Sequence, residues 1–309
     1  MIDGVLSFTV TFIGSGAISS LQFSQLCTAV SKIFECYDSP RLRIANMFLT
    51  TPLQQSGGDP HFKRFQAPRR ESFHGECDLV MLKAPLFDLH IRTTIAQHYS
   101  FIELAAVKMK ERILEISTGN PSSVLLDGKV HSMDGFEPLI FSSFHKNTTY
   151  KYYNADTSRS SKTKTYILEI TPWVFIRVKM HAEFLTVSVH GDDDLDGAVG
   201  LLGRYPDGAL VTRSGEVVSV PFAEFAAEWQ VNPDDGVLFQ EPRTPQLPYE
   251  RCRMPTISRP SRRMLRASSD GLYQKALEAC RKVDYFADDI DLCIDDILAT
   301  GDVGLATIW

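Results

Sequence analysis

Three aspartates in a short acidic loop are the residues whose spacing most directly suggests chemistry. Asp192, Asp194 and Asp196, followed by Gly197, match the first positions of the loop that binds calcium in EF-hand proteins. The twelfth position of that loop requires a glutamate that binds with both oxygens, and this chain has Gly203 there. The sequence therefore argues against an EF-hand. It leaves two alternatives, an irregular calcium loop or a solvated turn, and predicts no other cofactor.

The six cysteines are the second set of reactive side chains. No Cys-x-x-Cys motif and no Cys/His cluster with zinc spacing occurs, so pairing explains the cysteines better than metal binding. Two pairs are close in sequence, Cys27 with Cys36 and Cys280 with Cys293. We expect each of these pairs to form a local disulfide, the second joining two helices into a hairpin. Disulfides persist in oxidising compartments, whereas reduced thiols would indicate the cytosol.

Signals for other chemistry are weak. The chain has no Gly-x-Ser-x-Gly elbow, no phosphate-binding glycine-rich loop and no His-Glu-x-x-His motif, which lowers the expectation of an enzyme without excluding one. The formal net charge of -6 disfavours nucleic acid as a partner, because clustered Lys and Arg bind phosphate backbones. Asn147 begins the one N-glycosylation sequon. No apolar run reaches about 18 residues, so no membrane-spanning segment is expected.

The beginning of the chain allows two interpretations. Residues 5–20 are apolar and small, like the core of a signal peptide, but no basic residue precedes them and Asp3 does. The period-two alternation of residues 6–12 favours a strand instead. With an amphipathic helix and a second strand at 43–49, it predicts a strand-helix-strand unit at residues 1–52.

The central part of the chain, residues 57–239, has the pattern of a β domain. Short alternating stretches are separated by Gly, Pro and Asp without intervening helices, which is typical of an antiparallel sandwich or barrel. Residues 147–164 are polar and predict an exposed loop or the tip of a long hairpin. The candidate strands are residues 77–82, 88–95, 105–109, 112–116, 123–126, 164–170, 174–180 and 184–189.

Two further segments follow the β domain. Residues 240–267 are rich in proline and arginine and predict a linker. Residues 268–309 begin with the helix-capping sequence Ser268-Ser269-Asp270 and predict a hairpin of two helices linked by Cys280 and Cys293. The fold class is therefore mainly β with α additions. The acidic residues of the last helix, expected on a solvated face, are Asp288, Asp289, Asp291, Asp295 and Asp296.

Four motifs follow one another in a recognisable order. They are Gly58-Asp59-Pro60-His61-Phe62, Phe73-His74-Gly75-Glu76-Cys77, Gly200-Leu201-Leu202-Gly203-Arg204-Tyr205 and Glu224-Phe225-Ala226-Ala227-Glu228-Trp229-Gln230-Val231, before a paired-cysteine tail with Ala299-Thr300-Gly301-Asp302. Their order and spacing resemble the von Willebrand factor type D (VWD) domain, an extracellular module of adhesive and matrix glycoproteins. The resemblance covers residues 57–309 and is closest to a cysteine-poor algal-type branch.

The resemblance implies a disulfide between Cys77 and Cys252, whose positions match a bonded pair of the family. A second family bond has lost both partners, with Leu202 at one of the two positions. The family's calcium site is also implied to be lost. Of its ligands only Asp207 remains, and Arg204 brings a positive charge close to it.

The function that the resemblance implies is non-catalytic. It is an extracellular or cell-surface structural or adhesive module that binds protein or glycan partners in a matrix or cell coat. His61 and His74 of the motifs are expected to be hydrogen-bonded structural residues. Two alternatives stay open: a hydrolase on a β-sandwich with loop carboxylates such as Asp192 and Asp194, and a cytosolic interaction module with reduced thiols.

Overall fold

A computed structural model describes residues 54–57, 60–97, 99–118, 123–132, 137–143, 148–156, 163–241, 252–256, 270–282 and 287–309. Contacts within the chain separate Met1–Thr50 from Thr51–Trp309, and all described residues belong to the second unit. The predicted unit at 1–52, the Cys27–Cys36 pair, the sequon at Asn147 and most of the linker at 240–267 lie outside the described residues.

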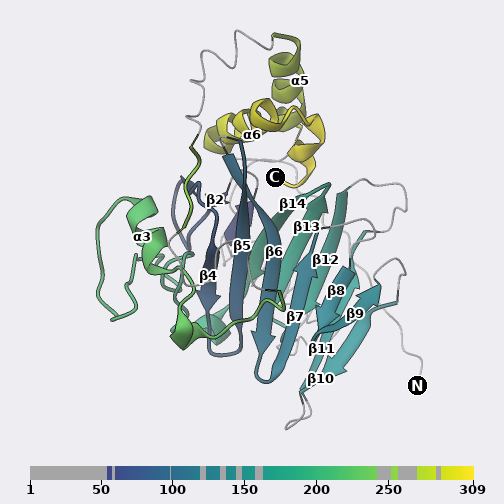
Figure 1. Cartoon of the computed structure of the whole chain (residues 1–309), viewed down its shortest axis with the longest axis vertical. Coiled ribbons are helices and arrows are strands. Elements are labelled where there is room, and N and C mark those ends of the chain that lie inside the picture. Colours follow the sequence, from purple (N-terminus) through teal and green to yellow (C-terminus); the bar gives the residue numbers. More distant parts are fainter. Residues whose placement is uncertain are drawn as a thin grey trace, which may run out of the picture. The chain divides into compact units, whose positions relative to one another are not determined.

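Two open antiparallel sheets make up most of the described chain and face each other (Figure 1). The first sheet has eight strands in the spatial order β10 (Leu139–Ser142), β11 (Thr149–Asn154), β12 (Thr163–Glu169), β13 (Phe175–His181), β14 (Phe184–His190), β1 (Gln54–Gly57), β2 (His61–Phe62) and β3 (Glu71–Ser72). The second has six, in the order β4 (Asp78–Lys83), β5 (Asp88–Ala96), β6 (Tyr99–Met109), β7 (Arg112–Ser117), β8 (Ser123–Leu126) and β9 (Lys129–Ser132). The mainly β antiparallel class is confirmed, with open sheets rather than a closed barrel.

The core lies between the sheets because alternate residues of each strand point inward. On β13 and β14 the inward residues pair across the strands, Val178 with Val187 and Ile176 with Val189, and all four are buried. This alternation is the pattern that predicts the strands from the sequence. Each predicted strand is present, and the largest difference is at β6, which begins at Tyr99 rather than at residue 105.

The segment 147–164 forms the hairpin that is one of its two predicted forms, because β11 pairs with β12 across it. It is not merely an exposed loop: Tyr150 and Tyr152 turn into the core and are 2% and 0% exposed. The alternation is hard to recognise in the sequence because tyrosine is counted as polar, although its large ring is apolar. The predicted β domain also contains a helix that the sequence does not predict, α3 (Phe222–Glu228), which follows the last strand and precedes Trp229. This helix buries Phe222 and Phe225 on one face, which places it against the sandwich core.

The C-terminal part forms the predicted helical hairpin (Figure 1). Helices α5 (Asp270–Arg281) and α6 (Ala287–Thr300) are joined by the Cys280–Cys293 disulfide and followed by the 3-10 helix η3 (Val303–Thr307). We call residues 270–282 and 287–309 the tail. Its apolar residues pack with Phe101 of β6 and Phe184 of β14. No helix in the described part of the chain has the length and hydropathy needed to span a membrane.

The acidic face of α6 is only partly solvated, which corrects the expectation for two of its aspartates. Asp295 and Asp296 are 5% and 1% exposed. Residues three positions apart share a helix face, so Asp296 lies beside Cys293, which is buried. A carboxylate can occupy such a position only when it is hydrogen-bonded or paired, and Asp296 has both kinds of partner.

Candidate functional site

The segments that carry the four motifs meet along the outer edge of β4. This strand ends the six-stranded sheet, so its edge is open to bonding by other parts of the chain. Val80 N donates to Trp229 O at 2.8 Å, which lays the fourth motif along β4. Phe65 N, just after the first motif, donates to Leu202 O of the third at 3.0 Å. Motifs separated by more than a hundred residues therefore form one continuous packed region.

Glycine is required at two points of this region. A Cβ at Gly200 would lie 2.6 Å from Met81 O, and a Cβ at Gly208 would lie 1.8 Å from Phe65 O. Both glycines have positive φ, of 151° and 68°. Only a residue without Cβ combines this conformation with such close backbone approach. Gly200 of the Gly-Leu-Leu-Gly motif is thus explained by close packing against β4, and Gly208 by close packing against Phe65.

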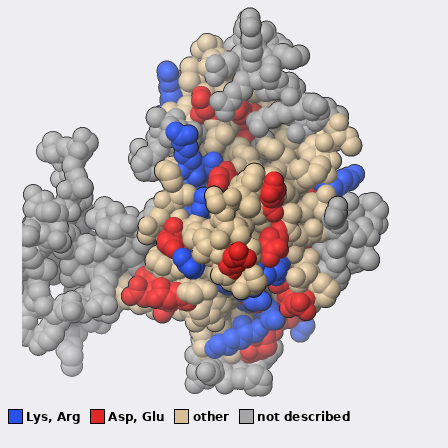
Figure 2. Space-filling view, turned by 90° about the vertical axis from the view of Figure 1, so that its left-hand side faces the viewer, with Lys and Arg blue, Asp and Glu red and all other residues tan. Residues whose placement is uncertain are grey.

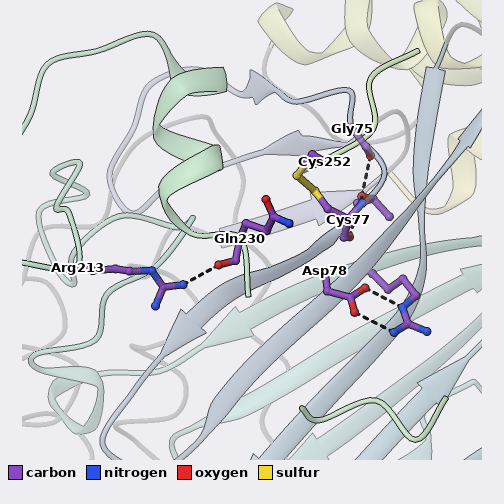
Figure 3. The surroundings of a disulfide bond; sticks show 8 residues. Gly75, Cys77, Asp78, Arg213, Gln230 and Cys252 are labelled. Carbon is purple, nitrogen blue, oxygen red and sulfur yellow. Dashed lines mark hydrogen bonds and ion pairs between the residues drawn. A yellow bond between two sulfur atoms is a disulfide. The ribbon is translucent and has the colours of Figure 1, made fainter. Parts of the chain in front are cut away.

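The Cys77–Cys252 disulfide closes the same region (Figure 3). Its Cα atoms are 4.8 Å apart and the two residues are 175 positions apart in sequence, the pairing that the resemblance implies. Next to it, Glu76 N donates to Arg253 O at 2.8 Å and Arg253 N donates back at 3.1 Å. Cys77 is 3% exposed. The bond and the bridge together fix Cys252 and Arg253, which lie within the predicted linker at 240–267, to the start of β4.

Charged residues on the face of β4 and β5 that points away from the eight-stranded sheet are paired beneath residues 238–241. Arg92 donates to both carboxylate oxygens of Asp78, at 2.7 and 2.8 Å, and its guanidinium lies 4.5 Å from the ring centre of Phe239. His90 is 2% exposed, and burial lowers the pKa of its imidazole to about 4, opposed by Asp235 and Asp78. These contacts seal this face of the sheet and bind residues 238–241 to it.

The three aspartates of the proposed calcium loop do not converge. They surround the 3-10 helix η1 (Asp193–Leu195), in which Asp192 Oδ1 accepts from Asp194 N at 3.3 Å and so caps the turn. Asp194 Oδ2 also accepts from Thr171 Oγ1 at 3.4 Å. Asp196 ends the turn, with its N–H donated to Asp193 O at 3.0 Å. In the described ranges, no group of three His, Cys, Asp or Glu side chains is placed to hold a metal ion.

The loop that matches the family's calcium site contains an ion pair. Arg204 Nε donates to Asp207 Oδ1 at 3.2 Å, and the pair is exposed. The pKa of Asp207 is lowered, first by its hydrogen bond from Arg204 and then by the N–H of Ala209. Asp207 is the one ligand that remains of the pattern in the resemblance. Its carboxylate is paired with Arg204.

The tail is attached to the β-sandwich by two similar hydrogen-bond chains. In the first, His61 Nδ1 lies 2.6 Å from Ser72 Oγ and His61 Nε2 lies 3.2 Å from Asp296 Oδ1. Trp309 Nε1 donates to the second oxygen of Asp296 at 3.0 Å. His61 is 0% exposed. The prediction that His61 is a hydrogen-bonded structural residue is confirmed.

The second chain repeats this order of groups. His181 Nδ1 lies 3.1 Å from Thr163 Oγ1, and His181 Nε2 lies 2.9 Å from Asp302 Oδ2. A carboxylate only accepts hydrogen bonds, so in both His61 and His181 the nitrogen Nε2 carries the hydrogen and donates it to the aspartate. The other oxygen of Asp302 accepts from Gly304 N at 2.8 Å and caps η3. We call the two chains together the tail junction.

Sequence reasoning does not find the tail junction. Nothing in the sequence distinguishes Asp296 from the other aspartates of α6. Only its contacts with His61 and Trp309 in the folded chain do. One signal was present: Asp302 lies in the Thr-Gly-Asp sequence after α6, and its side chain caps the next helical turn. Ser72 and Trp309 carry no such signal.

The side of the molecule on which α3 lies in Figure 1 carries both signs of charge. Figure 2 shows this side, where Lys and Arg side chains alternate with Asp and Glu over the described residues. Arg213 is one basic residue of this region, and its Nη1 donates to Asp235 Oδ1 at 2.8 Å. Interspersed and paired charges of this kind give no single-sign surface for a polyelectrolyte.

No protein-family model matches this chain, and a search of curated proteins finds no match either.

Proposed function

We propose that the chain is a non-catalytic, extracellular or cell-surface structural module of the VWD type, which binds protein or glycan partners in a matrix or cell coat. The observation that carries the proposal is the Cys77–Cys252 disulfide, which joins positions 175 residues apart. Two disulfides indicate a non-reducing environment, because cytosolic reductants keep thiols reduced. The family resemblance supplies the step from that environment to an adhesive role.

The meeting of the four motifs supports the family assignment. In this chain each motif has a structural reason: the glycines allow close approach, Cys77 forms the bond, and Trp229 lies along β4. Such motifs select a way of packing rather than a reaction. A disulfide that closes such a long loop stabilises the folded chain outside the cell. The chain-entropy model gives it about 5 kcal/mol.

The test combines location with the state of the thiols. We expect the protein isolated from its source to be found outside the cell or on its surface. Peptide mapping without reductant should give one fragment that joins Cys77 to Cys252 and another that joins Cys280 to Cys293. A cytosolic protein with six free thiols would overturn the proposal in favour of an intracellular interaction module.

The hydrolase alternative has its own test. If loop carboxylates act in catalysis, Asp192→Asn and Asp194→Asn must abolish hydrolysis of a substrate that the unaltered chain cleaves. We expect no such activity, because the carboxylate of Asp192 accepts from Asp194 N and caps a turn, and the carboxylate of Asp194 accepts from Thr171 Oγ1. A panel of glycoside, ester and peptide substrates, with Asp207→Asn as a control at the neighbouring loop, decides the question.

A further inference from the structure

The outer face of the eight-stranded sheet carries a row of basic side chains. Along β13 the core residues alternate with Arg177, Lys179 and His181, which therefore point to the opposite face. On the neighbouring strand His190 pairs with Phe175 and lies on that same face. Across β1, the register of the strands also brings His61 of β2 to this face. We call Arg177, Lys179, His181, His190 and His61 the basic row.

The tail supplies oxygen acceptors to one part of this row. Asp296 and Asp302 accept from His61 and His181, and the main-chain oxygen of Trp309 accepts from Lys179 Nζ at 3.4 Å. An aromatic ring accompanies these oxygens, since the rings of Trp309 and His61 have centres 5.4 Å apart. The tail therefore shows which chemistry suits the basic row: acidic oxygens beside a flat ring surface.

The other part of the row lacks an acidic partner. Arg177 makes no ion pair and its guanidinium no hydrogen bond with any residue of the described chain; the ring centre of Phe175 lies 5.9 Å from it. Burial lowers the pKa of Arg177. Burial, followed by repulsion from Arg177 and Arg70, lowers the pKa of Lys179 to about 8. Two neighbouring cations that are partly buried favour the binding of an anion.

The carboxylates that face this region are engaged elsewhere. Asp156 is close enough to act on the charge of Lys179, but its Oδ2 accepts from Thr165 N at 2.5 Å. Glu169 pairs with Phe175 across β12 and β13, and its Oε1 accepts from Tyr153 at 2.9 Å while Lys151 lies 3.9 Å from Oε2. Neither carboxylate bonds to Arg177.

Next to these cations is a flat aromatic surface. The rings of Phe175 and His190 are stacked, with centres 4.3 Å apart and planes 9° from parallel. Among the described residues His190 Nε2 has no hydrogen-bond partner, and burial with repulsion from Arg177 lowers the pKa of the imidazole to about 3. The imidazole is therefore neutral at physiological pH and behaves as a ring surface, while Arg177 and Lys179 supply the charge.

We propose that Arg177 and Lys179, with the stacked rings of Phe175 and His190, form a binding site for a sulfated polysaccharide. The sulfate group binds the guanidinium of Arg177, and Lys179, which also donates to Trp309 O, adds positive charge beside it. The apolar face of the sugar ring packs on the aromatic pair. The site rests on the proposed function and names the class of glycan that the module binds. A peptide strand fits less well, because β13 and β14 are interior strands whose backbone groups are bonded to neighbours on both sides.

The experiment measures binding of the full chain to fluorescent dextran sulfate, with neutral dextran as the comparison. We expect binding of dextran sulfate only, with an affinity that falls as salt is raised. Arg177→Gln should weaken it about tenfold, since one charge-assisted hydrogen-bond donor set is lost. Arg204→Gln, at an exposed arginine outside the row, is the matched control and should leave the affinity unchanged. Arg177→Lys, which keeps the charge, checks that any loss does not come from unfolding.

Several results would overturn the site: no binding of dextran sulfate, equal loss in Arg177→Gln and Arg204→Gln, or equal affinity for polyglutamate. Phe175→Ala must also weaken dextran sulfate more than inorganic sulfate, or the aromatic part of the proposal is wrong. The outcomes separate the two proposals. A secreted, disulfide-bonded protein that ignores dextran sulfate contradicts the site alone. A cytosolic protein with reduced thiols that binds it through Arg177 contradicts the proposed function alone.

Discussion

His61 Nε2 lies 3.2 Å from Asp296 Oδ1, and the two residues are 235 positions apart in sequence. His61 is the first residue of the two-residue strand β2, and Asp296 lies in α6. Their contact is buried, with side chains 0% and 1% exposed. The tail is therefore not an appendage of the β-sandwich but shares a polar core element with it.

We expect Asp296→Ala to destabilise the protein by about 2–4 kcal/mol, because His61 and Trp309 would lose their common acceptor inside the structure. Urea unfolding measures the change. Asp291→Ala, at an exposed position of the same helix, is the matched control and should change stability by less than about 0.5 kcal/mol. Equal effects of the two substitutions would contradict the role given to the buried contact.

The two disulfides should differ in their contribution to stability. The loop-closure model gives about 5 kcal/mol for Cys77–Cys252, which spans 175 positions, and about 3 kcal/mol for Cys280–Cys293, which spans 13. We therefore expect the Cys77→Ser/Cys252→Ser variant to be the less stable one in denaturant unfolding. The reverse order would show that strain or residual structure in the unfolded chain outweighs loop entropy.

Gly208→Ala should destabilise the protein by more than about 2 kcal/mol. Its Cβ would lie 1.8 Å from Phe65 O, so the loop after the third motif must move away from the first. Gly215→Ala is a matched control, because Gly215 also has positive φ, 87°, but open space around it. There only the backbone conformation costs free energy, about 1 kcal/mol. Thermal unfolding of both variants tests the difference.

Stability should fall in acid because of His90. Its pKa is lowered from 6.5 to about 4 in the folded state, so the unfolded chain takes up the proton first as pH falls. The contribution of neutral His90 is complete above pH 6.5 and is lost between pH 6.5 and about 4. It amounts to about 3 kcal/mol at most. His90→Asn should flatten the pH dependence of the unfolding free energy in this window, measured by urea unfolding at several pH values. An unchanged pH dependence in this variant would contradict the prediction.

Much of the β domain can be predicted from the sequence, because burial of one strand face leaves a period-two pattern. Residues 184–189 alternate in this way, and the observed strand is Phe184–His190. Where tyrosines occupy the buried positions, as at Tyr150 and Tyr152, the period-two pattern is not recognised from the sequence. The helical hairpin is predicted equally well, because caps and apolar spacing are local signals.

The motifs identify positions that matter but not what they contact. The sequence indicates a bond between Cys77 and Cys252 only through a family resemblance, and the spacing of Asp192, Asp194 and Asp196 suggests a metal loop that the folded turn does not form. Spacing fixes neighbours along a helix or strand, but not whether side chains in a loop turn toward one point.

By itself, the sequence determined the strands and the two final helices, since each depends on interactions within a few residues. Only the tertiary structure decided which aspartate of α6 is buried, which histidines hold the tail, and that Arg177 is left without an acidic partner while Lys179 bonds the tail. These choices depend on contacts between distant segments. The packing of the whole chain, rather than any local pattern, brings those segments together.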